Sequence, residues 1–314
     1  MSNFTAKESG RLDKILSIEI NQSRNQVNKL ICDELVKVNN KIVVKSSHKI
    51  KIEDTIEYIF KEAIKKEALD VDFDVEILYE DDDILVVNKP NGVIIHPAPS
   101  VKEPTLVDWL IKKGISLSTI SGEERHGIVH RIDKETTGAL VVAKNNEAHQ
   151  KLSEQLQDKS MGRYYLAIID CPLKDDIVVD KPIGRSQANR LKMAVLNGAK
   201  EAKSLFRKLS LSKIDKRELI SAKLYTGRTH QVRVHLASLG RHIIGDELYG
   251  FSDKRDRNNR VQLHAYILYL IHPSTGKKMQ FVAPMFDDMI ELLNNKFDID
   301  EVKKQIRPEN IVAI

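Results

Sequence analysis

Apolar residues recur at helical spacing twice near the N-terminus, in residues 12–16 and in residues 27–31. Ser23 and Gln26 stand just before the second segment and form an S-x-x-Q capping box, in which each side chain can bond a free backbone amide of the first helical turn. The pattern predicts two short helices in this part of the chain.

The periodicity then changes from helical to alternating. Apolar and polar residues alternate across residues 36–44 on either side of Asn39-Asn40, a pair that tolerates positive φ, and this predicts a β-hairpin. A further strand is predicted over residues 50–59, with an interruption at Asp54. Two helices packed on a small twisted hairpin make residues 11–60 a small α/β module.

The rest of the chain mixes many short strand patterns with few helical ones. Residues 61–76 are charged and predict a linker, residues 77–289 predict one large domain, and residues 290–314 predict a C-terminal tail of helical character. The strand patterns lie at Ile84–Val87, Ala139–Val142, Tyr164–Ile169, Ile177–Val179, Leu219–Leu224 and Ile267–Ile271, and the helical patterns at Thr105–Lys113, Glu147–Gln157 and Thr229–Leu239. Because strands outnumber helices and do not alternate with them, the prediction is an α+β fold with a mixed, mostly antiparallel sheet.

Charge is distributed unevenly along the chain. The net charge is +5, yet residues 181–233 alone hold 14 Lys and Arg against three Asp and Glu. Such an excess within a folded region indicates a polyanionic partner, although charge alone does not distinguish RNA from DNA or an acidic membrane. The sequence has no apolar run long enough for a transmembrane helix, no signal peptide, and two cysteines that make no disulfide framework, so a cytoplasmic protein is expected.

Common cofactor and metal signatures are missing from the sequence. There is no dinucleotide fingerprint, phosphate-binding loop, serine-hydrolase elbow or H-E-x-x-H motif. His130 to Asp133 resembles the kinase H-R-D, but it has an extra residue and lacks the asparagine that should follow. His230 and His235 are five residues apart on a predicted helix, roughly 140° around its axis, and cannot share one ion. The sequence therefore displays no recognisable cofactor or metal site.

One pair of charged residues stands out because apolar segments enclose it. Arg131 and Asp133 lie between Ile128-Val129 and the strand at residues 139–142, and residues two apart in an extended segment point the same way. A sheltered carboxylate stays ionised only with a cation or several donors nearby; Arg131 offers one, and Arg228, at the opening of a predicted helix, offers a second. From these residues alone, a purely structural ion pair is the favoured alternative.

The order of the motifs along the chain changes that balance. The segments are VVNKPNGVIIHP (86–97), HGIVHRIDKETTGALVVAK (126–144), RYYLAI (163–168), LYTGRTHQVRVHLASLGRHIIGDELYG (224–250) and LHAYILYLIHP (263–273). Together they resemble the successive motifs of the RluA family of pseudouridine synthases, with Ile132 where Leu is usual and Thr137 where Ser is common. The resemblance implies that Asp133 is the nucleophile, Arg131 helps to open the RNA, Tyr165 stacks on the target base and Arg228 pairs with the nucleophile.

The N-terminal module has a resemblance of its own. Its residues 11–60 are similar to the αL RNA-binding module named for a small-subunit ribosomal protein, which implies RNA contacts at Arg11, Ser23, Arg24 and Lys29. This module and Met193–Val195 make the chain similar to the family members that modify large-subunit (23S-type) ribosomal RNA. The implied activity is isomerisation of uridine to pseudouridine in structured RNA by a monomer. The alternatives are a non-catalytic ribosome-assembly factor and the same chemistry on transfer RNA.

Overall fold

The computed structural model describes residues 2–20, 24–59, 68–97, 101–118, 127–251 and 260–312. The described residues up to Ala68 form one compact unit, here called the N-terminal unit, and those from Leu69 onward form a second, the C-terminal unit. Ser23, and with it the predicted capping box, lies outside the described residues. Within the described residues, no helix has both the length and the apolar character that a membrane crossing demands.

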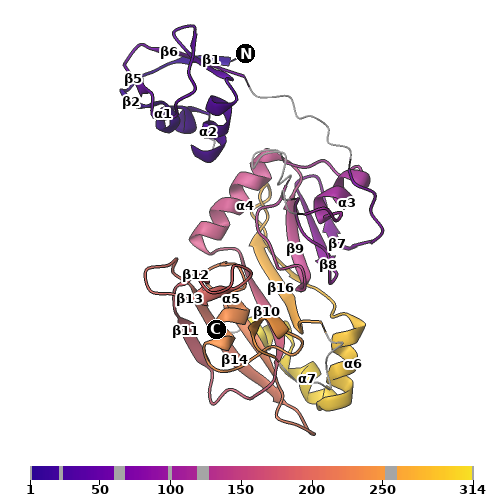
Figure 1. The fold of residues 1–314 in the computed structure, drawn as a ribbon. Coiled ribbons are helices and arrows are strands. Elements are labelled where there is room, and N and C mark those ends of the chain that lie inside the picture. The colour runs from indigo at the N-terminus through magenta and orange to yellow at the C-terminus, as the bar shows by residue number, and fades with distance from the viewer. Residues whose placement is uncertain are drawn as a thin grey trace. The chain divides into compact units, whose positions relative to one another are not determined.

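The N-terminal unit packs two helices against short strands (Figure 1). Its elements are β1 (Ser2–Thr5), β2 (Gly10–Arg11), α1 (Leu12–Glu19), α2 (Arg24–Cys32), β3 (Val36–Val38), β4 (Lys41–Ile42), β5 (Lys49–Ile50) and β6 (Thr55–Tyr58). Strands β3 and β4 form the predicted hairpin, and Asn39 and Asn40 both have positive φ, 49° and 63°, as a tight turn of this type requires. Strand β1 pairs with β6 and so extends the sheet before residue 11, where the predicted module begins.

The C-terminal unit is built on one nine-stranded sheet (Figure 1). Its strand order is β11–β14–β15–β10–β16–β9–β8–β7, with β17 also paired to β16, and only β9 and β16 run parallel. The strands are β7 (Glu76–Glu80), β8 (Ile84–Lys89), β9 (Thr137–Ala143), β10 (Gly162–Ile169), β11 (Ile177–Asp180), β14 (Lys203–Leu211), β15 (Glu218–Leu224), β16 (Leu263–Ile271) and β17 (Lys278–Val282), beside a separate hairpin of β12 (Ile183–Arg185) and β13 (Met193–Val195). The predicted α+β class with a mostly antiparallel sheet is confirmed.

Two apolar layers cover the sheet, and β10 shows why both form. Its odd-numbered residues Tyr165, Ala167 and Ile169 pack into the core that includes α3 (Leu106–Lys112) and α5 (Gln231–Ala237). Its even-numbered residues pack on the opposite face, against the C-terminal helices. Every residue of β10 is buried, because alternate side chains of a strand point to opposite faces and here both faces are covered.

The predicted C-terminal tail is part of this second layer. Helices α6 (Asp287–Lys296), α7 (Ile299–Gln305) and α8 (Pro308–Val312) bury apolar side chains against the even-numbered residues of β10, and α4 (Asn146–Asp158) packs on β9 and β16 of the same sheet. The predicted boundary between the large domain and the tail, at residue 290, therefore falls inside α6. Likewise residues 69–75 of the predicted linker lie along α3, where Trp109 Nε1 donates to Asp74 Oδ1 at 2.9 Å.

The parallel pairing of β9 and β16 fixes the loop that precedes β9. Gly138 pairs with Ala265 there, and a Cβ at Gly138 would lie 2.3 Å from the Ala265 carbonyl oxygen. Its φ of 112° also lies in the region that favours glycine. Thr137 and His264 bond across the same junction, with Oγ1 2.8 Å from Nδ1. Residues 131–136 are thereby held next to the start of β16.

Candidate active site

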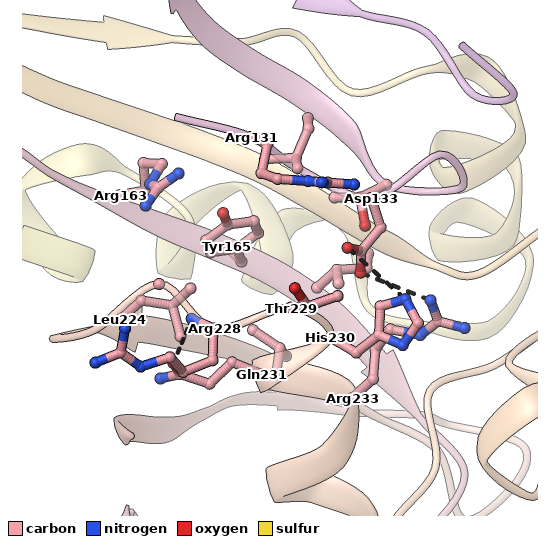
Figure 2. Close-up of a pocket in the computed structure, with 15 residues that line it drawn as sticks. Arg131, Asp133, Arg163, Tyr165, Leu224, Arg228, Thr229, His230, Gln231 and Arg233 are labelled. Atoms are coloured by element: carbon pink, nitrogen blue, oxygen red, sulfur yellow. Dashed lines mark hydrogen bonds and ion pairs between the residues drawn. The ribbon is translucent and has the colours of Figure 1, made fainter. Parts of the chain in front are cut away.

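A polar pocket opens on the face of the sheet that carries α5 (Figure 2). It is lined by the 131–136 loop, by β10, and by the segment that runs from the end of β15 into α5. All four residues that the sequence predicted for the active site, Arg131, Asp133, Tyr165 and Arg228, line it. Segments separated by about a hundred positions thus meet at one place, within the C-terminal unit.

Asp133 lies at one side of the pocket with a guanidinium and an imidazole near its carboxylate. Oδ2 is 3.6 Å from Arg233 Nη1, and Oδ1 is 4.0 Å from His230 Nε2. The Asp133 side chain is only 16% exposed, so the charge of Arg233 acts on it through little water. Neither neighbour is within short hydrogen-bond distance of the carboxylate, which leaves its oxygens free to react.

Arg233 is held in place by a second carboxylate. Its guanidinium makes a two-pronged pair with Asp246, at 2.7 Å from Nε and 2.8 Å from Nη2, and both side chains are almost fully buried. Nη1, the remaining corner, faces Glu135 Oε2 at 3.2 Å as well as Asp133. The bond to Asp246 raises the pKa of Arg233 above its usual range despite its burial, so the charge beside Asp133 is permanent.

His230 has a strained backbone that aims its ring at the pocket. It is the residue before α5 and has φ 57° and ψ 20°, a left-handed conformation that is costly for a residue with a side chain. Nδ1 lies 2.8 Å from the hydroxyl of Tyr249, which belongs to a 3-10 turn at Glu247–Tyr249. Burial lowers the pKa of His230, so near neutral pH the ring is uncharged.

Tyr165, and not its neighbour Tyr164, lines the pocket. Tyr165 is 4% exposed and belongs to the odd-numbered face of β10, whereas Tyr164 packs among the C-terminal helices and lies under the amine of Lys223. Burial raises the pKa of Tyr165, which keeps its phenol neutral. An uncharged aromatic ring beside a carboxylate is a suitable surface for a nucleobase.

The expected pairing of Arg228 with Asp133 is wrong for this structure. Arg228 Nε donates instead to the carbonyl oxygen of Glu201 at 2.8 Å, and the described residues include no Arg228–Asp133 contact within 4.0 Å. Arg228 lies in the turn before α5 and away from Asp133 in Figure 2, whereas Arg233 lies inside the helix and within 3.6 Å of the carboxylate. Arg131 is also exposed at the pocket rim.

A buried lysine, Lys89, bonds the backbone of the loop that carries Asp133. Lys89 is fully buried at the end of β8, and its Nζ donates to the carbonyl oxygens of Pro90, Val93 and Lys134 at 2.8, 2.9 and 3.0 Å. The last of these belongs to the residue directly after Asp133. Burial lowers the pKa of Lys89 to about 7, so near neutral pH the folded protein holds both the ammonium, which can donate to all three oxygens, and the neutral amine, which can donate to two.

We expect Lys89→Met to lower the free energy of unfolding by about 3 kcal/mol or more, because buried carbonyl oxygens would lose their donor. It should also lower the rate of the chemical step, since the Asp133 loop would lose its support. The folded pKa of Lys89 lies below the unfolded value of 10.5, so the wild type gains stability between pH 7 and 10. Urea unfolding of both proteins at pH 7 and pH 9 checks this: the wild-type advantage should grow with pH. An advantage that shrinks would contradict the assigned role of burial.

One group of possible metal ligands lies elsewhere in the C-terminal unit. Ligand atoms of Asp81, Asp83 and His272 lie within 4.8 Å of one another. Both oxygens of Asp81 are already engaged: Oδ2 accepts from Tyr79 and His272 at 2.7 Å, and Oδ1 accepts from two backbone amides at 2.8 Å. The arrangement closes the turn between β7 and β8, and it gives no reason to place an ion there.

Comparison with known proteins decides the family of this chain. A family model described as RNA pseudouridylate synthase matches residues 83–238. An RNA pseudouridine synthase of Helicobacter pylori J99, described as uncharacterized, is 43% identical over 309 residues, which cover 96% of this chain and 94% of that protein. The chain belongs to the RNA pseudouridine synthase family.

Other relatives carry more specific names. The ribosomal large subunit pseudouridine synthase D of Zymomonas mobilis is 39% identical over 291 residues, covering 89% of this synthase and 91% of that protein. Among solved structures, human RNA pseudouridylate synthase domain containing 1 superposes with a TM-score of 0.54 at 23% identity, over 70% of this chain and 95% of that one. The structural likeness supports the fold of the C-terminal unit. The S4 domain model matches residues 10–56 of the synthase, in the N-terminal unit.

Two of the arginines predicted for RNA binding in the S4 domain share one carboxylate. Asp13 is 2% exposed, and it accepts from Arg11 at 3.0 Å through both oxygens and from Arg24 at 2.6 Å. The bond from Arg11 is the largest influence that lowers the pKa of Asp13, to about 2. Arg11 and Arg24 are half exposed, so each can still donate outward, and Lys29 is exposed as well.

Sequence reasoning missed several residues of the synthase pocket. Arg233, His230 and Arg163 all lie inside motifs that the sequence displays, yet none was selected. In the structure every residue of α5 between Gln231 and Leu236 is buried, so the charged and polar side chains of this helix need partners inside the protein. The sequence alone does not show that this helix is covered on all sides.

Proposed function

We propose that this protein isomerises uridine to pseudouridine at specific positions of large-subunit ribosomal RNA, with Asp133 as the nucleophile. In this proposal Tyr165 stacks on the target base, and Arg131 and Arg228 hold the RNA at the pocket rim. Residues 77–289 supply the chemistry and residues 11–60 bind structured RNA. The reaction changes no oxidation state and transfers no group from a donor, so the enzyme needs no cofactor. In this proposal it works in the cytoplasm as a monomer.

The observation that carries the proposal is the setting of Asp133. Its carboxylate is sheltered, lies 3.6 Å from the fixed charge of Arg233, and shares a pocket with the buried ring of Tyr165. A nucleophilic carboxylate needs a cation that keeps it ionised and a surface that holds its substrate in place. A structural ion pair would need neither an open pocket nor an aromatic wall.

The geometry supports a sequence of steps in which the base leaves its helix. Flipping a uridine out of the RNA costs a few kcal/mol of stacking and pairing, and stacking on Tyr165 recovers about 1–3 kcal/mol. Arg131, which is exposed, and Arg228, which is half-buried, line the pocket rim, where the phosphates of the flipped nucleotide would pass. The N1–C1′ bond then breaks, the base turns, and a C5–C1′ bond forms while C5 loses its proton.

The choice of ribosomal RNA rests on two observations. Relatives from Zymomonas mobilis and Pseudomonas aeruginosa that are about 40% identical are named ribosomal large subunit pseudouridine synthase D. The basic residues between Lys181 and Arg233 include those of the β12–β13 hairpin, whose Arg185 and Arg190 are exposed. A non-catalytic assembly factor would not require the pocket residues to be retained together.

Release of tritium from RNA labelled at C5 of uridine tests this function, because C5 gives up its proton in the isomerisation. Purified protein should release tritium from a transcript of large-subunit ribosomal RNA and not from a transfer RNA pool. Release from transfer RNA alone would move the activity to that substrate. No release from any RNA would support the assembly factor.

We expect the triple variant Arg11→Gln, Asp13→Asn, Arg24→Gln, which leaves no buried carboxylate without its partners, to bind structured RNA about tenfold more weakly, because it removes two guanidinium groups that can reach phosphates. Kd measured at several salt concentrations should give a salt slope smaller by about two. The single-turnover rate at saturating enzyme should stay at the wild-type value, since the pocket is untouched. Lys14→Gln, at an exposed position of the adjoining helix α1, is the matched control. An unchanged slope would show that these arginines do not contact RNA.

A further inference from the structure

One buried cation in the pocket has no anionic partner. Arg163 lies on β10 two residues before Tyr165, and its side chain lines the pocket although the residue is only 8% exposed. Among the described residues no carboxylate lies within ion-pair distance of it, whereas Arg233 on the other side of the pocket has three such neighbours. The Nε atom of Arg163 is buried without any hydrogen-bond partner. A desolvated charge left in this state is costly unless a ligand pairs with it.

The nearest polar group, His130, does not satisfy this charge. Arg163 Nη1 lies 2.6 Å from His130 Nδ1, while the amide of Val141 donates to Nε2 of the same ring at 3.2 Å. A neutral imidazole has one accepting nitrogen, so it can accept from the amide or from the guanidinium but not from both. Burial and the charge of Arg163 lower the pKa of His130 well below its usual value. The ring is therefore neutral and has a single accepting nitrogen.

The place of Arg163 indicates what it meets. Figure 2 shows Arg163 and Asp133 on opposite sides of Tyr165. Gly227 borders the guanidinium, and a Cβ there would lie 3.4 Å from Nη2, so the absence of a side chain keeps this edge open. A base stacked on Tyr165 with its ribose beside Asp133 would direct its far edge to Arg163. In this arrangement only the flipped base enters the pocket, and the phosphates stay outside, near Arg131 and Arg228.

We propose that Arg163 is a catalytic residue that donates hydrogen bonds to a carbonyl oxygen of the flipped uracil and stabilises the negative charge that develops on the base. This inference rests on the proposed function. When Asp133 forms a bond to C1′, the N1–C1′ bond breaks and its electron pair stays on the uracil, spread over N1, O2 and O4. C5 then attacks C1′ and releases Asp133, the proton on C5 leaves to solvent, and N1 takes up a proton. A fixed, desolvated guanidinium beside O2 or O4 stabilises this anion in the way that an oxyanion site does.

Arg163→Met should lower the single-turnover rate on the order of 10²- to 10³-fold while RNA affinity changes little. The decisive readout pairs the variant with altered RNAs: one with 2-thiouridine at the target, one with 4-thiouridine, and one with a methylphosphonate beside it. Sulfur is a weak hydrogen-bond acceptor, so the rate lost through Arg163→Met should shrink to below about tenfold on one of the thio-RNAs. It should keep its full size on the methylphosphonate RNA.

Three results would overturn the assignment. An equal loss of rate on all RNAs means that Arg163 only supports the fold. A loss of rate that shrinks only on the methylphosphonate RNA means that Arg163 binds phosphate. No loss of rate on any RNA means that Arg163 has no role in the reaction. Arg163→Lys, tested on the same RNAs, should retain part of the rate and covers the case in which the methionine variant does not fold. Arg207→Met, on strand β14 and outside the pocket, is the matched control and should keep the wild-type rate. Wild-type protein without activity on any RNA would instead contradict the proposed function itself.

Discussion

Asp133→Asn is expected to abolish pseudouridine formation, with a rate at least on the order of 10⁴-fold below that of the wild type. The amide keeps the size of the carboxylate but loses its charge and its nucleophilic oxygen. Arg233 and Asp246 are already paired, so the change leaves no buried charge alone and the fold should persist. RNA affinity should stay within a few-fold of the wild type, because the rim and the S4 domain are intact.

Single-turnover rates and Kd values for the two proteins check this expectation. Glu135→Gln is the matched control: Glu135 also faces Arg233, at 3.2 Å, but does not line the pocket. It should retain its rate within about tenfold. Appreciable turnover by Asp133→Asn, or an equal loss in the control, would remove Asp133 from the role of nucleophile.

Arg233→Met is expected to reduce both activity and stability. Asp246 is 1% exposed, and loss of its guanidinium partner leaves a buried carboxylate unpaired, which costs about 3–5 kcal/mol. Asp133 loses the cation that lies 3.6 Å away, so the rate should fall on the order of 10³-fold. The rate and the stability of Arg233→Lys should lie between those of the wild type and of Arg233→Met, because an ammonium keeps the charge but cannot make the two-pronged bond.

A double variant separates the two effects of Arg233. Arg233→Met combined with Asp246→Asn removes the buried carboxylate along with its partner and should recover part of the lost stability. Activity should stay low, because the cation beside Asp133 is still missing. Thermal unfolding and single-turnover assays of the single and double variants measure this. If activity returned together with stability, Arg233 would serve the fold and not the nucleophile.

The sequence predicted the elements whose local patterns are clear. The Asn39-Asn40 hairpin and the helix that begins with the Thr105–Asp108 capping box both formed as expected, since turn and cap chemistry depend on neighbouring residues. The packing of the C-terminal helices on the sheet does not follow from the sequence. They cover the even-numbered face of β10, and this strand is buried on both faces. Such a strand gives no sign of which partner lies on which face.

The same limit applies to the pocket. Its predicted members came from motifs, and the structure places them together, but the cation beside Asp133 is Arg233 and not Arg228. Both arginines lie in one motif, five residues apart, and local sequence favours neither. The choice is made by Asp246, which is thirteen residues beyond Arg233 and holds its guanidinium from the other side. Contacts between distant residues of this kind do not follow from spacing.

The most direct test of the account is a map of pseudouridines in ribosomal RNA from cells whose only copy of this protein carries Asp133→Asn, compared with cells that carry the wild type. We predict that a small set of positions in large-subunit RNA loses pseudouridine, while transfer RNA and small-subunit RNA keep theirs. An unchanged map of large-subunit RNA, with the variant protein present at its normal level, would contradict the account.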